Sequence, residues 1–232
     1  MISIIIPAWN EEKYISKLLD CIKKQKYENY EIIVADADST DKTRQIAKMY
    51  GCKIVKGGMP AVGRNNGAKA AKGEILAFFD ADVQFSQDFL RNVADEFKHR
   101  KLDVAGCLIN PLSKEMTYKI FFAIYNFIIF LIQFFYPNAA GCSIFCKRSL
   151  YKKVKGFDET IKLGEDLDYV SRCAKRGKFR IIKSEKVSLS MRRFDNEGKF
   201  KVTFRHIASA SYRIVFGQIR KDIFKYNLNY KK

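Results

Sequence analysis

Two aspartates at the end of an apolar run are the residues of this sequence best suited to hold a metal ion. Asp80 and Asp82 follow Ile75–Phe79, a run typical of a buried strand. Residues i and i+2 leaving a strand project to the same side, so both carboxylates can reach one point. A hard cation such as Mg²⁺ or Mn²⁺ prefers oxygen ligands and would stabilise a departing diphosphate. The D-x-D pattern is common, however, and capping of the following turn by Asp82 is the simpler interpretation of this pattern alone.

Carboxylates also follow two other apolar runs. Asp36 and Asp38 come after Glu31–Ala35, and Glu11 lies shortly after the N-terminal apolar run. A carboxylate at such a strand end can accept hydrogen bonds from a base N–H or a ribose hydroxyl, as in dinucleotide-binding folds. Helix capping by residues 39–41 is the alternative, and the two interpretations are compatible. Carboxylates gathered at one sheet edge repel each other unless a cation or ligand donors offset their charge.

The segment Val62–Gly67 is rich in glycine and in hydrogen-bond donors. Its Arg64 carries a planar guanidinium that can bind phosphate through paired hydrogen bonds. The segment does not match the P-loop pattern, because Gly67 is not followed by Lys and then Ser or Thr. Taken alone, a loop that leads into a helix is the simpler interpretation.

The runs that position these residues predict a doubly wound α/β fold. Four runs are apolar throughout, as in parallel strands covered on both faces: Ile2–Ile6, Glu31–Ala35, Cys52–Val55 and Ile75–Phe79. Helical patterns occur at Glu11–Lys24, Asp41–Tyr50, Val62–Ala71 and Ser86–Phe97. We expect Pro7 to end the first strand. The alternation predicts a Rossmann-like, mostly parallel sheet flanked by helices, with ligands at the carboxyl ends of the strands.

The composition fits a folded protein with a strongly basic C-terminal part. The 232 residues are 47% apolar and carry a net charge of +18, and this apolar content excludes an extended disordered chain. Residues 142–232 hold 24 basic and 9 acidic side chains, which predicts a polyanionic neighbour: nucleic acid, anionic lipid or a phosphorylated substrate. Six cysteines without a C-x-x-C pair argue against a disulfide scaffold and a structural zinc site. Because no signal-peptide pattern begins the sequence, we expect a cytoplasmic protein with reduced thiols.

Residues 120–136 form an apolar stretch that is short for a membrane span. As a helix they would extend about 26 Å, against about 30 Å for a hydrocarbon core. A span would also place residues 164–168 on the opposite side of the membrane from Asp80. One polar stripe runs along the helix, formed by Tyr118, Tyr125, Asn126 and Gln133. We therefore predict an apolar helix in the membrane interface with its stripe toward the protein, the alternative being a buried core helix.

Residues 199–232 interleave aromatic and basic side chains. Near an anionic leaflet, each basic side chain would add about 1 kcal/mol to membrane binding. The same interleaving suits RNA, whose bases stack on aromatic rings, but no RNA-binding or helix-turn-helix pattern accompanies it. We therefore expect contact with a membrane surface and none with nucleic acid.

Six motifs, in this order, resemble the family-2 glycosyltransferases with the GT-A fold. They occupy Ser3–Glu12, Asp36–Thr43, Gly63–Gly67, Ala71–Asp82, Lys155–Glu159 and Gly164–Asp168. The resemblance covers roughly residues 1–185. The Q-x-x-R-W motif of processive polysaccharide synthases in this family is missing, which favours the addition of a single sugar.

The resemblance implies a set of residues that bind a nucleotide sugar. The implied pocket consists of Pro7, Ala8, Asn10, Glu11, Asp36, Asp38, Arg64 and Asp80. Asp36 would hold the base, and Asp80 and Asp82 would hold the ribose and a Mg²⁺ or Mn²⁺ ion bound to the diphosphate. Ala37 and Asp38 stand where the family usually has two small residues, so Asp38 departs from the family pattern.

Asp166, preceded by Glu165, matches the position of the general base in this family. An acceptor hydroxyl must lose a proton as it attacks the sugar, and a carboxylate within reach can take that proton. Direct displacement with a single base would invert the anomeric centre. From the residues alone, first-turn acids that stabilise a helix at 165–176 are the simpler interpretation. A lipid-phosphate acceptor is already ionised, and Asp166 would then orient the acceptor instead.

Three arginines outside the motifs are candidate phosphate contacts: Arg172, Arg192 and Arg193. Each carries a permanently charged, planar guanidinium, although a solvated basic surface explains them equally well. His206 is a candidate third metal ligand, which is the less frequent role for a lone histidine.

The sequence thus predicts a GT-A catalytic domain at 1–191 and a basic amphipathic extension at 192–232. The donor half would cover about 1–110 and the acceptor half about 111–191. We expect a metal-dependent transfer from a nucleoside-diphosphate sugar to a lipid-linked saccharide or polyprenyl phosphate. The protein would be peripherally bound at the cytoplasmic face of a membrane. The alternatives are a nucleotidylyltransferase that forms a sugar nucleotide, a basic nucleic-acid-binding module and a catalytically silent scaffold.

Overall fold

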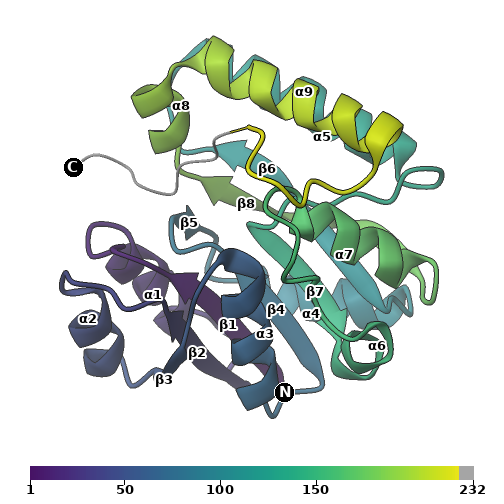
Figure 1. The fold of residues 1–232 in the computed structure, drawn as a ribbon. Coiled ribbons are helices and arrows are strands. Elements are labelled where there is room, and N and C mark those ends of the chain that lie inside the picture. Colours follow the sequence, from purple (N-terminus) through teal and green to yellow (C-terminus); the bar gives the residue numbers. More distant parts are fainter. Residues whose placement is uncertain (225–232) are drawn as a thin grey trace.

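The structure, a computed structural model, describes residues 1–224 and shows a mixed sheet with helices on both faces (Figure 1). The strand order is β3-β2-β1-β4-β7-β6-β8-β5. The strands are β1 (Ile2–Ala8), β2 (Tyr30–Asp36), β3 (Lys53–Lys56), β4 (Ile75–Phe79), β5 (Val83–Gln84), β6 (Val104–Pro111), β7 (Ser143–Lys147) and β8 (Phe179–Leu189). The helices are α1 (Ile15–Lys23), α2 (Thr43–Met49), α3 (Pro60–Ala70), α4 (Phe89–His99), α5 (Met116–Ile132), α6 (Arg148–Val154), α7 (Glu165–Ala174), α8 (Arg192–Glu197) and α9 (Lys199–Phe216). The predicted α/β fold class is confirmed.

The N-terminal half of the sheet is parallel, as predicted. β1 pairs in parallel with β2 and β4, and β3 pairs with β2. The prediction that Pro7 ends the first strand is wrong, because β1 continues through Pro7 to Ala8. In a strand, the backbone N–H and C=O groups of successive residues point alternately to the two neighbouring strands. The Ala8 carbonyl accepts a hydrogen bond on the β2 side, so the nitrogen of Pro7 faces β4. Pairing with β4 has already stopped at Ile5 and Phe78, and the missing N–H of proline therefore leaves no strand hydrogen bond unmade.

All four helices predicted within residues 11–97 begin at residues other than those predicted; α2 and α4 start two and three residues late, at Thr43 and Phe89. α1 starts at Ile15 rather than Glu11, because residues 11–14 form a turn in which the Glu11 carbonyl accepts the N–H groups of Tyr14 and Ile15. α3 starts at Pro60, two residues before the predicted start. Proline is favoured in the first helical turn because its missing N–H would have no partner within the helix.

The C-terminal half of the sheet contains strands that the sequence patterns did not predict. β7 pairs antiparallel with both β4 and β6, and so joins the two halves of the sheet. β6 and β8 run parallel, with a register shift after Cys107, and β5 pairs antiparallel with the end of β8. Beyond β8, the N–H of Ser190 donates to the Asp82 carbonyl. The chain after β8 therefore returns to the carboxyl ends of β1 and β4.

Apolar side chains fill both faces of the sheet. One cluster packs α1 and α4 against it, and the other packs α3, α6 and α7 against the opposite face. Gly67 in α3 lies directly on β1: a Cβ at this position would be 2.4 Å from Cγ2 of Ile5. This close contact fixes α3, and with it Arg64, over the parallel half of the sheet.

The apolar helix α5 turns its polar stripe toward the protein, as predicted. The Asn126 side chain accepts the N–H of Ile109 at 2.9 Å and donates to the carbonyl of Ile109 at 2.7 Å. The Gln133 side chain accepts the N–H of Ile181 at 3.0 Å. α5 starts and ends four residues before the predicted stretch 120–136. Within residues 1–224, no helix combines the length and the apolar character needed to cross a bilayer.

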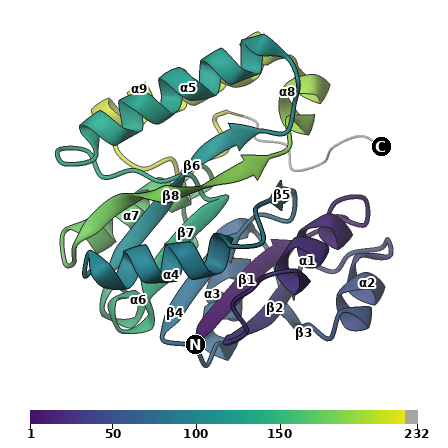
Figure 2. The same ribbon diagram turned by 180° about the vertical axis from the view of Figure 1, so that it is seen from behind.

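α9 lies at the same end of the molecule as α5 (Figures 1 and 2). Their N-terminal ends are joined by an ion pair between Lys199 and Glu115. Both helices leave large apolar side chains exposed, namely Ile120, Ile124, Phe127, Leu131, Phe200, Phe204, Ile207 and Ile214. We call these residues the α5–α9 apolar surface. Residues 225–232 of the predicted extension lie outside the described residues.

Candidate active site

Arg192 joins two of the predicted acidic residues in a largely buried ionic triad. Its Nη1 and Nη2 donate to the two Glu11 carboxylate oxygens at 2.6 and 2.7 Å, and its Nε lies 2.8 Å from Asp82 Oδ2. The guanidinium lies over the Tyr14 ring, 4.3 Å from its centroid. The three charged side chains are between 11% and 15% exposed. A cavity of about 260 Å³, partly lined by Tyr14 and Ser190, reaches Asp82.

Burial raises the pKa of both carboxyl groups in this triad. For Glu11, burial raises the pKa above its ordinary value, although the hydrogen bonds and the charge of Arg192 act in the opposite direction. For Asp82, burial again raises the pKa, Arg192 lowers it, and the charge of Asp80 adds to the rise. Further positive charge at this place would therefore stabilise the ionised carboxylates.

Asp80 and Asp82 fit a divalent cation that is shared with a substrate. Mg²⁺ is commonly held by one or two carboxylates, with phosphate oxygens and water as its other ligands. Within the described part of the chain, no three His, Cys, Asp and Glu side chains converge as a metal-binding group. His206 is exposed on α9 and is not brought to the two aspartates as a third ligand. This donor set suits a cation completed by a diphosphate and not a closed protein site.

Arg64 in α3 links Asp80, which follows β4, to Glu165 at the start of α7. Its buried guanidinium places Nη2 2.9 Å from Asp80 Oδ1 and Nη1 2.6 Å from Glu165 Oε1. Burial alone would lower the pKa of Arg64, but Asp80 and Glu165 hold it above its ordinary value. Burial raises the pKa of Glu165, and the charge of Arg64 opposes that rise. The structure thus places Arg64 as a bridge between two predicted site residues.

Asp166 lies next to this bridge, in the first turn of α7. Gly164 precedes the helix with a φ of +82°, a conformation that favours glycine. Asp166 Oδ2 accepts the N–H of Gly141 at 2.7 Å, and the Gly141 carbonyl lies 3.4 Å from Arg64 Nη2. A Cβ at position 141 would lie 2.7 Å from that nitrogen and 3.0 Å from Asp166 Oδ2. Glycine at 141 therefore allows Arg64 and Asp166 to approach the backbone of the same residue.

The residues predicted to bind the base lie beyond the ends of β1 and β2. Asn10, with a φ of +54°, accepts the N–H of Thr40 on Oδ1 at 2.9 Å. Asp36 is fully buried, and its Oδ2 accepts a hydrogen bond from Arg44 Nε at 3.1 Å. Its Oδ1 is also buried and accepts no hydrogen bond within residues 1–224. Such an oxygen is costly to leave unpaired, so it suits a donor such as a base N–H. Asp38, with a φ of +57°, is exposed beside it.

Two of the predicted phosphate contacts have different surroundings. Arg172 donates to Asp168 Oδ2 at 2.7 Å and to the Val154 carbonyl at 2.8 Å, and so it ties α7 to α6. Arg193 is partly buried in α8, and its charge acts on Asp82, lowering the pKa that burial raises. Arg193 is therefore close to the proposed diphosphate position, whereas the contacts of Arg172 are those of a packing residue.

Two residues of the site were not predicted from the sequence: Tyr14 and Gly141. Tyr14 owes its role to the position of Arg192, which no local pattern indicates. Gly141 ends the run Ala139–Gly141 of small residues after the apolar helix. A small residue in such a run could have indicated close contact with another backbone or side chain.

Comparisons with known proteins identify relatives of this chain. The sequence model of "Glycosyl transferase family 2" matches residues 3–154. The Methanococcus voltae protein dolichyl N-acetyl-alpha-D-glucosaminyl phosphate 3-beta-D-2,3-diacetamido-2,3-dideoxy-beta-D-glucuronosyltransferase is 30% identical over 199 residues, which are 76% of this chain and 62% of that protein. Staphylococcus aureus TarS 1–349 in complex with UDP-GlcNAc has a TM-score of 0.68 at 22% identity, over 82% of this chain and 58% of its own.

A second solved structure has a similar fold. The mannosyltransferase PcManGT from Pyrobaculum calidifontis, in complex with GDP-Man and Mn²⁺, has a TM-score of 0.66 at 24% identity, over 78% of this chain and 54% of its own. The likeness to these structures shows the GT-A fold. This chain spans 62% of the methanococcal protein and little more than half of the chains in the two structures.

Proposed function

The chain belongs to glycosyl transferase family 2, and we propose that it transfers one sugar from a nucleoside-diphosphate sugar to an acceptor. The observation that carries this proposal is the contact series Asp80–Arg64–Glu165, with Asp166 bound to the backbone N–H and Arg64 to the carbonyl of the same residue, Gly141. It links the residue proposed for the diphosphate to the residue proposed for the acceptor. Transfer between two bound substrates requires such a fixed relation between their sites.

The donor nucleotide is assigned to the carboxyl ends of β1, β2 and β4. The buried Oδ1 of Asp36 offers an acceptor for a base N–H. Asp80 and Asp82 would hold Mg²⁺ or Mn²⁺, which would neutralise charge on the departing diphosphate. The Mn²⁺ named with GDP-Man in the PcManGT structure supports this assignment. Arg192 holds a fixed positive charge against Asp82.

Asp166 is assigned as the general base for a hydroxyl acceptor. The N–H of Gly141 orients its carboxylate, and a carboxylate has lone pairs for several hydrogen bonds. One of these can take the proton of the attacking hydroxyl. Displacement with this single base would invert the anomeric centre. Arg64 neutralises the adjacent Glu165, so that the proposed base does not face a second unpaired carboxylate.

The acceptor is assigned as a lipid-linked saccharide or a polyprenyl phosphate at the cytoplasmic face of a membrane. The name of the methanococcal relative contains a dolichyl phosphate sugar. The α5–α9 apolar surface and the basic excess of residues 142–232 suit peripheral binding to an anionic leaflet.

The experiment that tests the proposed reaction is a panel of nucleoside-diphosphate sugars, including UDP-GlcNAc and GDP-mannose. Each is assayed with Mg²⁺ or Mn²⁺ for nucleotide release, with membrane lipid extract added or withheld. We expect lipid-stimulated release of nucleoside diphosphate that Asp82→Ala abolishes. Full turnover by Asp82→Ala would refute the metal assignment, and release of pyrophosphate would indicate a nucleotidylyltransferase.

Liposome sedimentation tests the proposed membrane contact. Phe127 and Phe204 are 63% and 73% exposed in α5 and α9, and Phe127→Ser with Phe204→Ser should release the protein from anionic vesicles. Met49→Ser is the matched control, because Met49 is 78% exposed in α2, outside the α5–α9 apolar surface. Equal binding by the wild type, the double variant and the control would contradict the proposed contact.

A further inference from the structure

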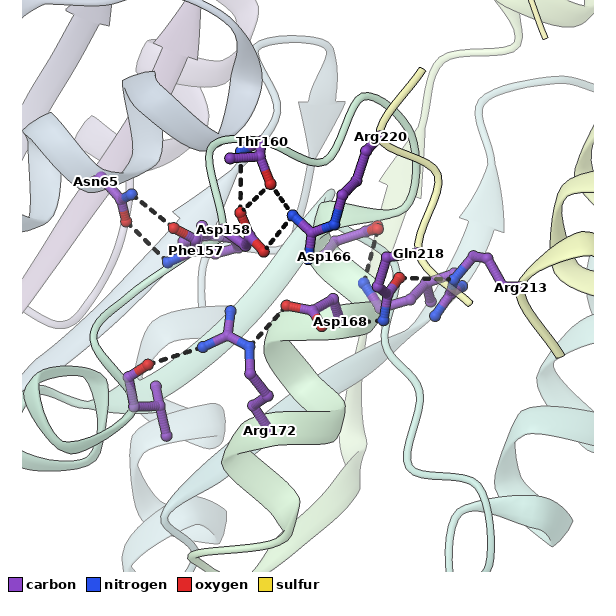
Figure 3. Close-up of polar contacts among 12 residues, drawn as sticks. Asn65, Phe157, Asp158, Thr160, Asp166, Asp168, Arg172, Arg213, Gln218 and Arg220 are labelled. Carbon is purple, nitrogen blue, oxygen red and sulfur yellow. Dashed lines mark hydrogen bonds and ion pairs between the residues drawn. The ribbon is translucent and has the colours of Figure 1, made fainter. Parts of the chain in front are cut away.

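A segment after α9 closes over the loop 158–164 and the first turn of α7, which follows this loop (Figure 3). Leu163 and Ile219 form an antiparallel bridge, in which the N–H of Lys162 donates to the Ile219 carbonyl at 2.8 Å. The Ile219 side chain is 1% exposed. The segment is thus packed into the protein by its backbone and by a buried side chain. We call residues 217–220 the C-terminal strap.

Two side chains of the strap bind acidic residues, one at the start of this loop and one in the first turn of α7 (Figure 3). Gln218 Nε2 donates to Asp168 Oδ1 at 3.0 Å. Arg220 Nη1 lies 3.0 Å from Asp158 Oδ2, and it also contacts Thr160. The strap therefore connects the start of the loop with the first turn of α7 by polar contacts.

The residues between these two anchors include the proposed base. Glu165 and Asp166 follow Gly164, whose φ of +82° interrupts the regular backbone. On the side away from the strap, Asn65 fixes the preceding residue through two hydrogen bonds with the Phe157 backbone, both of 2.9 Å. Residues without regular secondary structure retain many conformations unless tertiary contacts restrict them. Asn65 also donates to Glu159 Oε1 at 2.8 Å, and the strap supplies such contacts to the rest of the loop, at Thr160, Lys162 and Leu163.

We propose that Gln218 and Arg220 are positioning residues, which hold Asp166 toward the acceptor through Asp168 and Asp158. The proposal rests on the transfer function proposed above. A shift of about 1 Å in a reacting group can lower a rate about 100-fold, so anchors outside the site can control the acceptor step. The strap lies beyond residues 3–154, the part that the family model matches. A segment outside that match thereby becomes part of the acceptor machinery.

Kinetic constants of strap variants test this proposal. Wild type, Gln218→Ala with Arg220→Ala, and the conservative Arg220→Lys are assayed with a lipid-linked saccharide, whose hydroxyl has to lose a proton, in detergent micelles and with the donor that the wild type uses. We expect the double variant to lose about tenfold or more in kcat/KM for the acceptor, with the donor KM within about twofold of the wild type. Arg220→Lys should keep most of the activity. Lys221→Ala is the matched control, because it removes the same charge from the next, exposed residue.

Hydrogen exchange provides a second measurement that does not need turnover. In the double variant, amides of residues 159–167 should exchange about tenfold faster, while the midpoint of global unfolding changes little. Unchanged exchange rates would overturn the proposal. Parallel changes in the kinetic constants for the donor and for the acceptor would also overturn it. If the wild type transfers no sugar, the proposed function fails. The exchange result then decides separately whether the strap holds the loop.

Discussion

The Asp166 carboxylate accepts two backbone hydrogen bonds, from the N–H of Gly141 on Oδ2 at 2.7 Å and from the N–H of Leu167 on Oδ1 at 2.8 Å. Asp166→Asn keeps the shape of the side chain but cannot accept a proton. Transfer to a hydroxyl acceptor should therefore fall about 10²–10⁴-fold, the usual contribution of general base catalysis. The loss should be much smaller with an ionised phosphate acceptor, because no proton has to be removed.

The measurement for Asp166→Asn compares single-turnover rates with the dissociation constant of the nucleoside diphosphate in the presence of Mn²⁺. The nucleotide affinity should stay within about twofold of the wild type, because Asp166 is assigned to the acceptor. A fall in nucleotide affinity as large as the fall in rate would place Asp166 in the donor site instead.

Arg192 neutralises two buried carboxylates at once, those of Glu11 and Asp82. Arg192→Gln should lower the free energy of unfolding by about 3–5 kcal/mol, because breaking a buried pair leaves uncompensated charge. Urea unfolding measures the change, and added Mg²⁺ should recover part of it by supplying charge near Asp82. Lys199→Gln is the control, since its ion pair with Glu115 is about half exposed and should contribute far less than the buried triad. Equal effects of the two substitutions would contradict the triad.

At the scale of elements, sequence patterns predicted the helices and strands that depend mainly on their own residues. They did not predict those that depend on contacts with distant parts of the chain. β4 has the predicted bounds, because a continuous apolar run between polar residues marks a strand buried on both faces. β5 has only two residues and exists through its pairing with β8, so no pattern in its own sequence could reveal it. One partner of Arg192 is Glu11, 181 positions away, and only the return of the chain after β8 brings them together. The types of residue in the site could therefore be predicted from the sequence, whereas the contacts between the side chains could not.

The contact between α4 and β8 depends on the ionisation of Glu96. Its carboxylate accepts the N–H groups of Lys183 and Ser184 and pairs with Arg100. Burial alone would raise the pKa of Glu96, but these hydrogen bonds from Ser184, Arg100 and Lys183 hold it below its ordinary value of 4.5. A carboxyl with a lowered folded-state pKa stabilises the protein above its unfolded pKa, and this stabilisation is lost as the pH falls through the folded pKa.

Glu96→Gln should therefore destabilise the protein by about 1–3 kcal/mol at neutral pH, the value of hydrogen bonds to a charged group. The difference from the wild type should shrink as the pH falls below 4.5, because the wild-type carboxyl is then protonated too. Urea unfolding of both proteins at several pH values between neutral and acidic measures this difference in the free energy of unfolding. A difference that is independent of pH would show that the ionised carboxylate is not what holds α4 to β8.

At the scale of the whole molecule, β7 and Arg64 both join the N-terminal half of the sheet to the C-terminal half. Strand β7 makes the backbone contact, because it pairs with β4 on one side and β6 on the other. Arg64 makes a side-chain contact, because it reaches both Asp80, after β4, and Glu165 in α7. Its guanidinium is buried, so its charge is not screened by solvent. The relative position of the two halves should therefore respond to changes at Arg64.

A double-mutant cycle on Arg64 and Glu165 tests this connection. Arg64→Met should destabilise the protein by about 3–5 kcal/mol, because it leaves two carboxylates without their shared cation. Glu165→Gln should lower the free energy of unfolding by less, since Arg64 then still pairs with Asp80. In the double variant, Glu165→Gln should recover part of the stability that Arg64→Met loses. Urea unfolding of the four proteins should give a coupling energy of about 0.5–3 kcal/mol. The exposed pair Lys26–Asp88 is the comparison, where Lys26→Met with Asp88→Asn should couple by less than about 1 kcal/mol. Additive effects at Arg64 and Glu165 would mean that the two halves are held together by the sheet and not by this arginine.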